Sequence, residues 1–231
     1  MTQQAARSDV RVLIIEDHAL FSESLELALS LEGYDVSRIP VAATGGAGKL
    51  LLGATTRLRP RIALLDLDLG PLGDGVRLIA PLVQAGVHVV VVTGSVDKAR
   101  WGESLRYGAR TVLSKTQPLN DILATVRRIN QGLPVMDRIE REELIQLWHD
   151  HREKLQVLLD RLHLLTPREQ VVLGHLMKGQ QVREIADRSV VSEATVRTQV
   201  KSILAKLEVS SQLAAVGMAH GIGWRPLAVA G

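Results

Sequence analysis

The 231-residue sequence contains no cysteine. Disulfide bonds, thiol catalysis and zinc sites built from cysteine are therefore excluded. It also lacks a long apolar run, since the stretch at 87–92 is far shorter than the roughly 18 residues that a membrane-spanning helix needs. Residues 1–9 are polar and show no pattern of an export signal. We therefore expect a cytoplasmic protein without a membrane segment.

The composition is that of a globular protein, with 46% hydrophobic and 23% charged residues. The length suits two domains of ordinary size, each with its own core. The net charge is only +3, but the last 66 residues alone carry +3. This modestly basic end of the chain permits nucleic acid binding without requiring it.

Short apolar runs alternate with amphipathic segments through the first 131 residues. Runs of this kind, bounded by glycine, proline and polar residues, predict strands near residues 10–15, 34–36, 62–65, 87–92 and 111–113. Helices are expected between them, including one over 44–58, and a last one over 118–131. Because parallel neighbouring strands need helical crossovers, this order predicts an α/β fold with a doubly wound, five-stranded parallel sheet.

Polar residues stand where these strands end. Asp66 follows the fully apolar run Ile62 to Leu65, which suits a central strand covered on both faces. Similar positions after the first, fourth and fifth predicted strands are occupied by Glu16, Asp17, Thr93 and Lys115. Reactions in open α/β sheets concentrate at the carboxyl edge, so we expect these five side chains to converge there. For Asp66 alone, a surface aspartate that begins a turn is an equally good interpretation.

Three carboxylates gathered in one place repel one another unless a hard dication lies among them. Mg²⁺ prefers such oxygen ligands and also binds phosphate oxygens. Lys115 would add a positive charge and Thr93 a hydroxyl. Together these groups suit the transfer of a phosphoryl group to a carboxylate.

On these residues, the segment 10–131 resembles the receiver domain of two-component response regulators. The resemblance implies that a sensor histidine kinase phosphorylates Asp66. It also implies that Asp17, Asp66 and the backbone carbonyl of Asp68 help to bind Mg²⁺, and that Glu16 acts through metal-bound water. Thr93 would hydrogen-bond the phosphoryl group, and Lys115 would pair with it.

The sequence departs from the family pattern in three places. The loop after Asp66 is one residue longer than usual, Val112 stands where a switching aromatic residue is common, and Thr116 replaces a frequent proline after Lys115. An alternative is therefore an atypical receiver controlled by ligands or protein partners without phosphorylation. The glycine-rich stretch before Lys49 lacks the first glycine and the Ser or Thr of a phosphate-binding loop. We do not expect an enzyme.

Residues 132–165 form the expected linker, with a helix over 137–164. Apolar side chains recur there at alternating steps of four and three, at Leu144, Trp148, His151, Leu155, Leu158, Leu162 and Leu165. Such a seam favours a two-helix coiled coil and hence a homodimer. Because further leucines widen the apolar face, packing of this helix against the first domain is the alternative.

Residues 166–231 form the expected second domain, of four helices. Thr166 and Glu169 predict a capping box around Pro167, and Ser192 should cap the third helix. Two short helices joined by a tight turn, with polar residues on the outer face of the second, suit a helix-turn-helix. A small helical bundle with solvated lysines is the alternative.

This segment resembles the four-helix DNA-binding domain of the LuxR family, in Leu-Thr-Pro-Arg-Glu169, Glu184-Ile-Ala, Ser192-Glu-Ala-Thr-Val and Ile-Leu-Ala-Lys-Leu207. The resemblance implies that base edges are reached by Arg197, Thr198 and Lys201. It implies that DNA phosphates are held by Ser192, Thr195, Arg168 and Lys206. A receiver joined to such a domain is similar to the NarL/FixJ class of transcription regulators.

Overall fold

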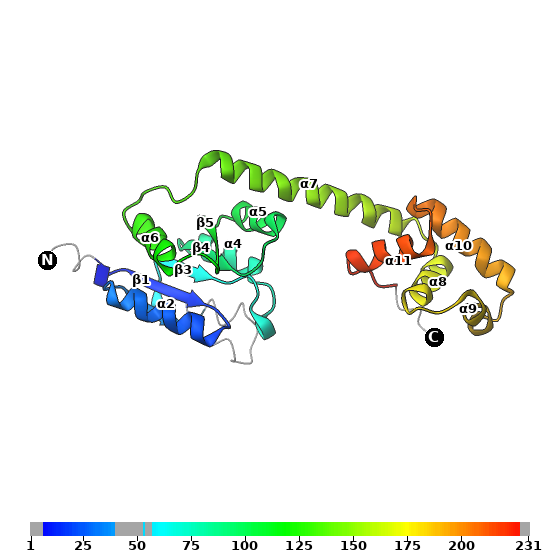
Figure 1. The fold of residues 1–231 in the computed structure, drawn as a ribbon, viewed down its shortest axis with the longest axis horizontal. Coiled ribbons are helices and arrows are strands. Elements are labelled where there is room, and N and C mark those ends of the chain that lie inside the picture. Colours follow the sequence, from blue (N-terminus) through cyan, green and yellow to red (C-terminus); the bar gives the residue numbers. More distant parts are fainter. Residues whose placement is uncertain (1–6, 40–52, 54–56, 227–231) are drawn as a thin grey trace. The chain divides into compact units, whose positions relative to one another are not determined.

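The fold was analysed in a computed structural model, which describes residues 7–39, 53 and 57–226. The chain divides into two compact units, residues 1–149 and residues 150–231 (Figure 1). Most of the helix predicted over 44–58 lies outside the described residues.

The first unit contains the predicted five-stranded parallel sheet. Its strands lie in the order β2-β1-β3-β4-β5 and are β1 (Arg11–Ile15), β2 (Asp35–Arg38), β3 (Ile62–Leu65), β4 (His88–Thr93) and β5 (Thr111–Ser114). The central strand β3 pairs Leu65 with Ile15 of β1 and with Val91 of β4. The predicted sheet and its carboxyl edge are therefore confirmed.

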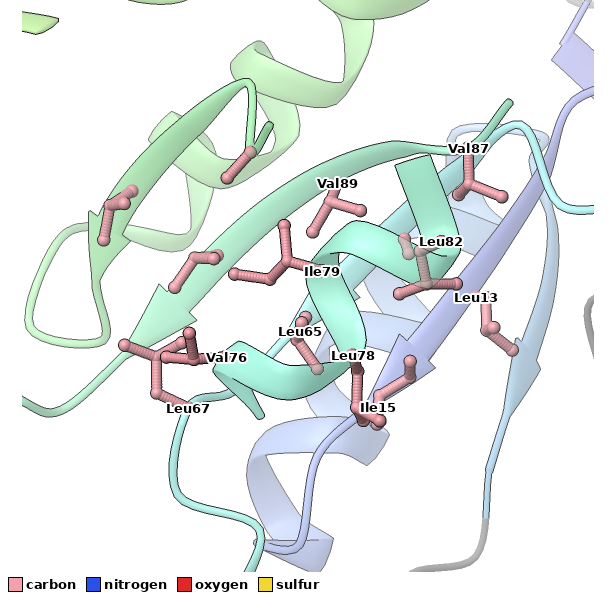
Figure 2. Packing of buried hydrophobic residues seen from close by; sticks show 14 of the residues in the cluster. Leu13, Ile15, Leu65, Leu67, Val76, Leu78, Ile79, Leu82, Val87 and Val89 are labelled. Carbon is pink, nitrogen blue, oxygen red and sulfur yellow. The ribbon is translucent and has the colours of Figure 1, made fainter. Parts of the chain in front are cut away.

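Side chains along each strand alternate between the two faces of the sheet. Both faces are apolar here, and helices cover each of them. One core contains Leu13, Leu65 and Val89 of the strands, under α4 (Val76–Gln84) and α5 (Lys98–Arg106). The other core lies under α2 (Ala19–Leu31) and α6 (Leu119–Asn130). Figure 2 shows α4 laid over the first core, with Ile79 and Leu82 directed toward the strands.

The long helix α7 (Arg138–His163) agrees with the predicted linker helix. Its first half packs on α5, where a Cβ added to Gly102 would lie 1.9 Å from the carbonyl oxygen of Leu144. Leu144 belongs to the core under α4 and α5, and Trp148 is buried. The Arg141 guanidinium donates to the carbonyl oxygens of Leu105 (2.8 Å) and Ala109 (2.9 Å). The first half of the predicted seam therefore takes the alternative arrangement, packing against the first domain.

The second unit contains α8 (Pro167–Met177), α9 (Val182–Ser189), α10 (Glu193–Leu207) and α11 (Gln212–Gly221). The capping box predicted at the start of α8 is present, with Thr166 and Glu169 each accepting a hydrogen bond from the backbone of the other. Leu162, from the end of α7, joins the core of these helices with Leu173 and Ile203. The seam residue Leu162 therefore packs within the second unit.

The close contact between α5 and α7 can be tested by adding a methyl group to Gly102. Gly102→Ala places a methyl group against the backbone of Leu144, so the helices must separate and the free energy of unfolding should fall by about 1–3 kcal/mol. Thermal unfolding and limited proteolysis of α7 would measure this. Gly217→Ala is the matched control, because a Cβ there meets nothing within 4 Å. Equal unfolding midpoints for both variants would contradict the tight α5–α7 contact.

Candidate functional site

Four of the predicted site residues meet at the carboxyl edge of the sheet. The Lys115 ammonium lies 2.7 Å from Asp66 Oδ2 and 2.8 Å from Glu16 Oε2. Carboxylate oxygens of Glu16, Asp17 and Asp66 lie within 4.8 Å of one another, together with a ring nitrogen of His18. The side chains of Glu16 and Asp66 are only 3% and 2% exposed. These carboxylates are therefore shielded from water and depend on a nearby cation.

Thr93 is fully buried where β4 ends, and its hydroxyl accepts a hydrogen bond from the Ser95 backbone N–H at 3.1 Å. The structure thus places Thr93 at the predicted edge, one residue beyond the position of β4 that is level with Asp66 in the sheet register. The Asp66 N–H donates to the Ile15 carbonyl oxygen at 2.9 Å, which fixes Asp66 beside the end of β1.

The charge of Lys115 is held by its partners. Burial acts to lower the pKa of the Lys115 ammonium, but its hydrogen bonds to Asp66 and Glu16 outweigh burial and raise the pKa above the ordinary value. Lys115 therefore stays charged throughout the neutral range. A fixed positive charge at 2.7 Å from Asp66 suits the stabilisation of an incoming anionic group.

The loop from Asp66 to Gly75 folds back on itself. Asp68 and Asp74 form an antiparallel bridge, and residues 70–72 form a short 3-10 turn. Gly75 is needed at the end of this loop, because a Cβ there would lie 2.1 Å from the carbonyl oxygen of Asp66. The end of the loop is thereby held close to Asp66.

Arg100 of α5 is a site residue that the sequence analysis missed. Its guanidinium donates to Asp68 Oδ1 (2.7 Å), Asp74 Oδ1 (2.9 Å) and the Leu67 carbonyl oxygen (2.9 Å). The side chain of Asp68 is thus engaged by Arg100, and only its backbone carbonyl was predicted as a metal ligand. Spacing alone could not reveal Arg100, because the contact depends on the path of the loop.

His18 was also missed, although it directly follows the acidic pair. Its Nδ1 lies 3.0 Å from Asp17 Oδ1, 3.1 Å from Glu16 Oε1 and 3.3 Å from Lys115 Nζ. The cluster of possible metal ligands in the described part of the chain therefore contains an imidazole as well as three carboxylates. The donor set fits a small dication.

The candidate nucleic-acid interface lies on the outer face of α10. Val196, Val200 and Ile203 are buried in the second core, while the predicted base-reading residues, Arg197, Thr198 and Lys201, are exposed. The hydroxyl of Ser192 caps the helix by accepting from the Thr195 N–H at 3.1 Å. Both the helix start and the outward face agree with the sequence prediction.

Three of the four predicted phosphate-contacting residues are exposed near the starts of α8 and α10. Arg168 and Thr195 line the same surface pocket, so the starts of α8 and α10 lie close together. The exposed side chain of Ser192 lies at the start of α10. These positions suit the backbone contacts that orient a helix in the major groove.

Lys206, the fourth, lies in a different environment. Its ammonium is 2.7 Å from Glu169 Oε2, and Ser202 donates to the other Glu169 oxygen at 2.6 Å. Burial acts to raise the pKa of Glu169, but these two hydrogen bonds and that from the Thr166 backbone lower it to about 2. Lys206 thus joins α10 to the start of α8 within the second unit.

No helix in the described part of the chain is long and apolar enough to cross a membrane.

Comparison with known proteins agrees with this geometry. Residues 12–127 match the family described as the response regulator receiver domain, and residues 163–219 match the bacterial regulatory proteins of the luxR family. The response regulator protein VraR of Staphylococcus aureus is 28% identical over 209 residues, which cover 90% of this chain and 94% of VraR.

The fold is similar to that of the RcsB response regulator of Salmonella typhimurium, with a TM-score of 0.51 and 20% sequence identity over 92% of this chain and all of the RcsB chain. The two matched families follow one another along the sequence, as the two resemblances do. The chain therefore belongs to the two-component response regulators that carry a receiver domain and a LuxR-type DNA-binding domain.

Proposed function

We propose that Asp66 accepts a phosphoryl group from a sensor histidine kinase, and that the phosphorylated protein binds promoter DNA as a dimer. The observation that carries the proposal is the buried Asp66 carboxylate, with Lys115 at 2.7 Å and two further carboxylates beside it. Asp66 supplies the nucleophilic carboxylate, and Lys115 supplies a positive charge that can stabilise the transferred phosphoryl group.

In the proposed step, an Asp66 carboxylate oxygen attacks the phosphorus of a phosphohistidine. The P–N bond breaks, the imidazole leaves with the electron pair, and an acyl phosphate forms on Asp66. Asp66 Oδ1 accepts a hydrogen bond from the Leu67 N–H at 2.6 Å, while Oδ2 faces Lys115.

The carboxylates of Asp17 and Glu16 and the carbonyl of Asp68 would hold Mg²⁺, directly or through water. Bound there, Mg²⁺ would neutralise charge on the phosphoryl oxygens. Lys115 would exchange one carboxylate contact for a phosphoryl oxygen. Thr93 would then offer its hydroxyl to the phosphoryl group from the end of β4.

DNA binding is proposed for the outer face of α10, with Arg197, Thr198 and Lys201 directed at base edges. Ser192, Thr195 and Arg168 would contact phosphates. Lys206 would also contact a phosphate, but more weakly, because its ion pair with Glu169 offsets its positive charge. One small domain offers few phosphate contacts, so joining two of them raises the effective concentration at paired half-sites.

The phosphorylation is tested by intact mass measurement after incubation with a small phosphodonor and Mg²⁺. The wild-type protein should gain one phosphoryl group, and Asp66→Asn should gain none, because an amide is not a competent nucleophile. Asp9→Asn is the matched control and should still be labelled, since this exposed aspartate precedes β1, at the opposite edge of the sheet. Equal labelling of wild type and Asp66→Asn would contradict the assignment.

The DNA interface is tested by binding of selected and random duplexes. Arg197→Ala should weaken binding to the selected site by about 1–3 kcal/mol and relax its sequence preference, because a bidentate contact to guanine is lost. Arg197→Lys keeps the charge and should retain affinity for random DNA while losing discrimination. A uniform loss on all duplexes would instead make Arg197 a phosphate contact.

A further inference from the structure

Arg100 has no part in the phosphoryl transfer described above, yet its side chain contacts the loop that follows Asp66 at three points. Its guanidinium donates to Asp68 Oδ1 at 2.7 Å, to Asp74 Oδ1 at 2.9 Å and to the Leu67 carbonyl oxygen at 2.9 Å. The Arg100 side chain is only 22% exposed. A guanidinium suits these three acceptors, because its donors form a rigid planar fork that can bind several oxygens at once.

The two aspartates of the loop need this positive charge. Asp68 and Asp74 lie opposite one another in the antiparallel bridge, where like charges destabilise the pairing. Burial acts to lower the pKa of Arg100, but its hydrogen bonds to the two aspartates outweigh burial and raise the pKa above the ordinary value. Arg100 therefore stays charged and offsets the repulsion that would open the loop.

The loop lies against the proposed phosphorylation and metal site. The Leu67 N–H donates to Asp66 Oδ1 at 2.6 Å, and the Leu67 carbonyl oxygen accepts from the Gly75 N–H at 2.8 Å. Further along, Gly70 has a φ of 51°, and a Cβ added to it would lie 3.1 Å from Asp17 Oδ2. A loop that opened would therefore move away from both Asp66 and Asp17.

We propose that Arg100 is a positioning residue that orients the backbone carbonyl of Asp68 toward Mg²⁺. The carbonyl and the side chain of Asp68 share one Cα, so a carboxylate bound to Arg100 restricts the direction of the carbonyl. The same contact keeps the Asp68 carboxylate away from a site that already gathers three carboxylates. The inference rests on the proposed function, because the metal role of the Asp68 carbonyl is assigned there.

The test measures Mg²⁺ affinity by calorimetric titration of the full-length protein without a phosphodonor. Arg100→Ala should lose affinity by about tenfold or more, the order expected when a group that orients a metal ligand is removed. Arg100→Lys keeps the charge but not the planar fork, so its affinity should be intermediate. Arg106→Ala is the matched control and should bind as the wild type does, because it removes an exposed arginine from the last turn of the same helix.

Two further measurements separate positioning from a general loss of stability. In labelling with a small phosphodonor, Arg100→Ala should raise the half-saturating Mg²⁺ concentration by about tenfold, while the rate at saturating Mg²⁺ falls by less than about threefold. Amide hydrogen exchange of the metal-free variant should be faster by about tenfold or more in residues 67–75, with β3 unchanged. A general loss of stability would speed exchange in β3 as well.

Three outcomes would overturn the proposal. Wild-type Mg²⁺ affinity in Arg100→Ala would remove the positioning role and leave the proposed phosphorylation of Asp66 in place. An equal loss of affinity in Arg106→Ala would assign the effect to the charge of α5 and not to the loop. A wild-type protein that binds no Mg²⁺ would remove the metal site, and with it this role of Arg100, from the proposed function as well.

Discussion

The Lys115 ammonium, placed between Glu16 and Asp66, is the interaction on which the receiver site depends. Two carboxylates that are almost fully buried would be costly to keep ionised without a cation, by several kcal/mol each. Lys115 follows β5, whereas the acids follow β1 and β3. The strand order β2-β1-β3-β4-β5, with all strands parallel, therefore brings the opposite charges together at one edge of the sheet.

The loop from Asp66 to Gly75 and the helix α7 both contact α5. Arg100 holds the side chains of Asp68 and Asp74 and the carbonyl of Leu67, on one side of that helix. Gly102, two residues further along, lies against the backbone of Leu144 in α7. The loop that follows Asp66 and the first half of α7 thus contact the same helix.

Much of this organisation could be predicted from the sequence, because it depends on local patterns. The apolar run at β3, the polar residues after each strand and the capping box at Thr166 are all readable from residue types and spacing. The outward face of α10 follows from helical periodicity in the same way. The edge of the sheet was predictable because parallel strands end together.

Contacts that depend on the path of a loop or on the packing of two helices were not predictable. The loop from Asp66 to Gly75 turns back so that Asp68 and Asp74 both contact Arg100. The spacing of these residues in the sequence does not predict this contact. The apolar seam in α7 was compatible with two interpretations, a coiled coil and packing on the first domain. The structure places Leu144 in the first core and Leu162 in the second, so one apolar seam serves two cores. The ion pair of Lys206 with Glu169 likewise needs the three-dimensional placement of α8 beside α10.

We propose that phosphorylation at the acidic pocket controls DNA binding through assembly of the dimer. The most direct test measures molar mass by light scattering and affinity for a selected duplex on the same sample, with and without phosphodonor and Mg²⁺. With the donor, mass and affinity should rise together in the wild-type protein. A protein that binds the duplex as a dimer equally well without the donor would contradict it.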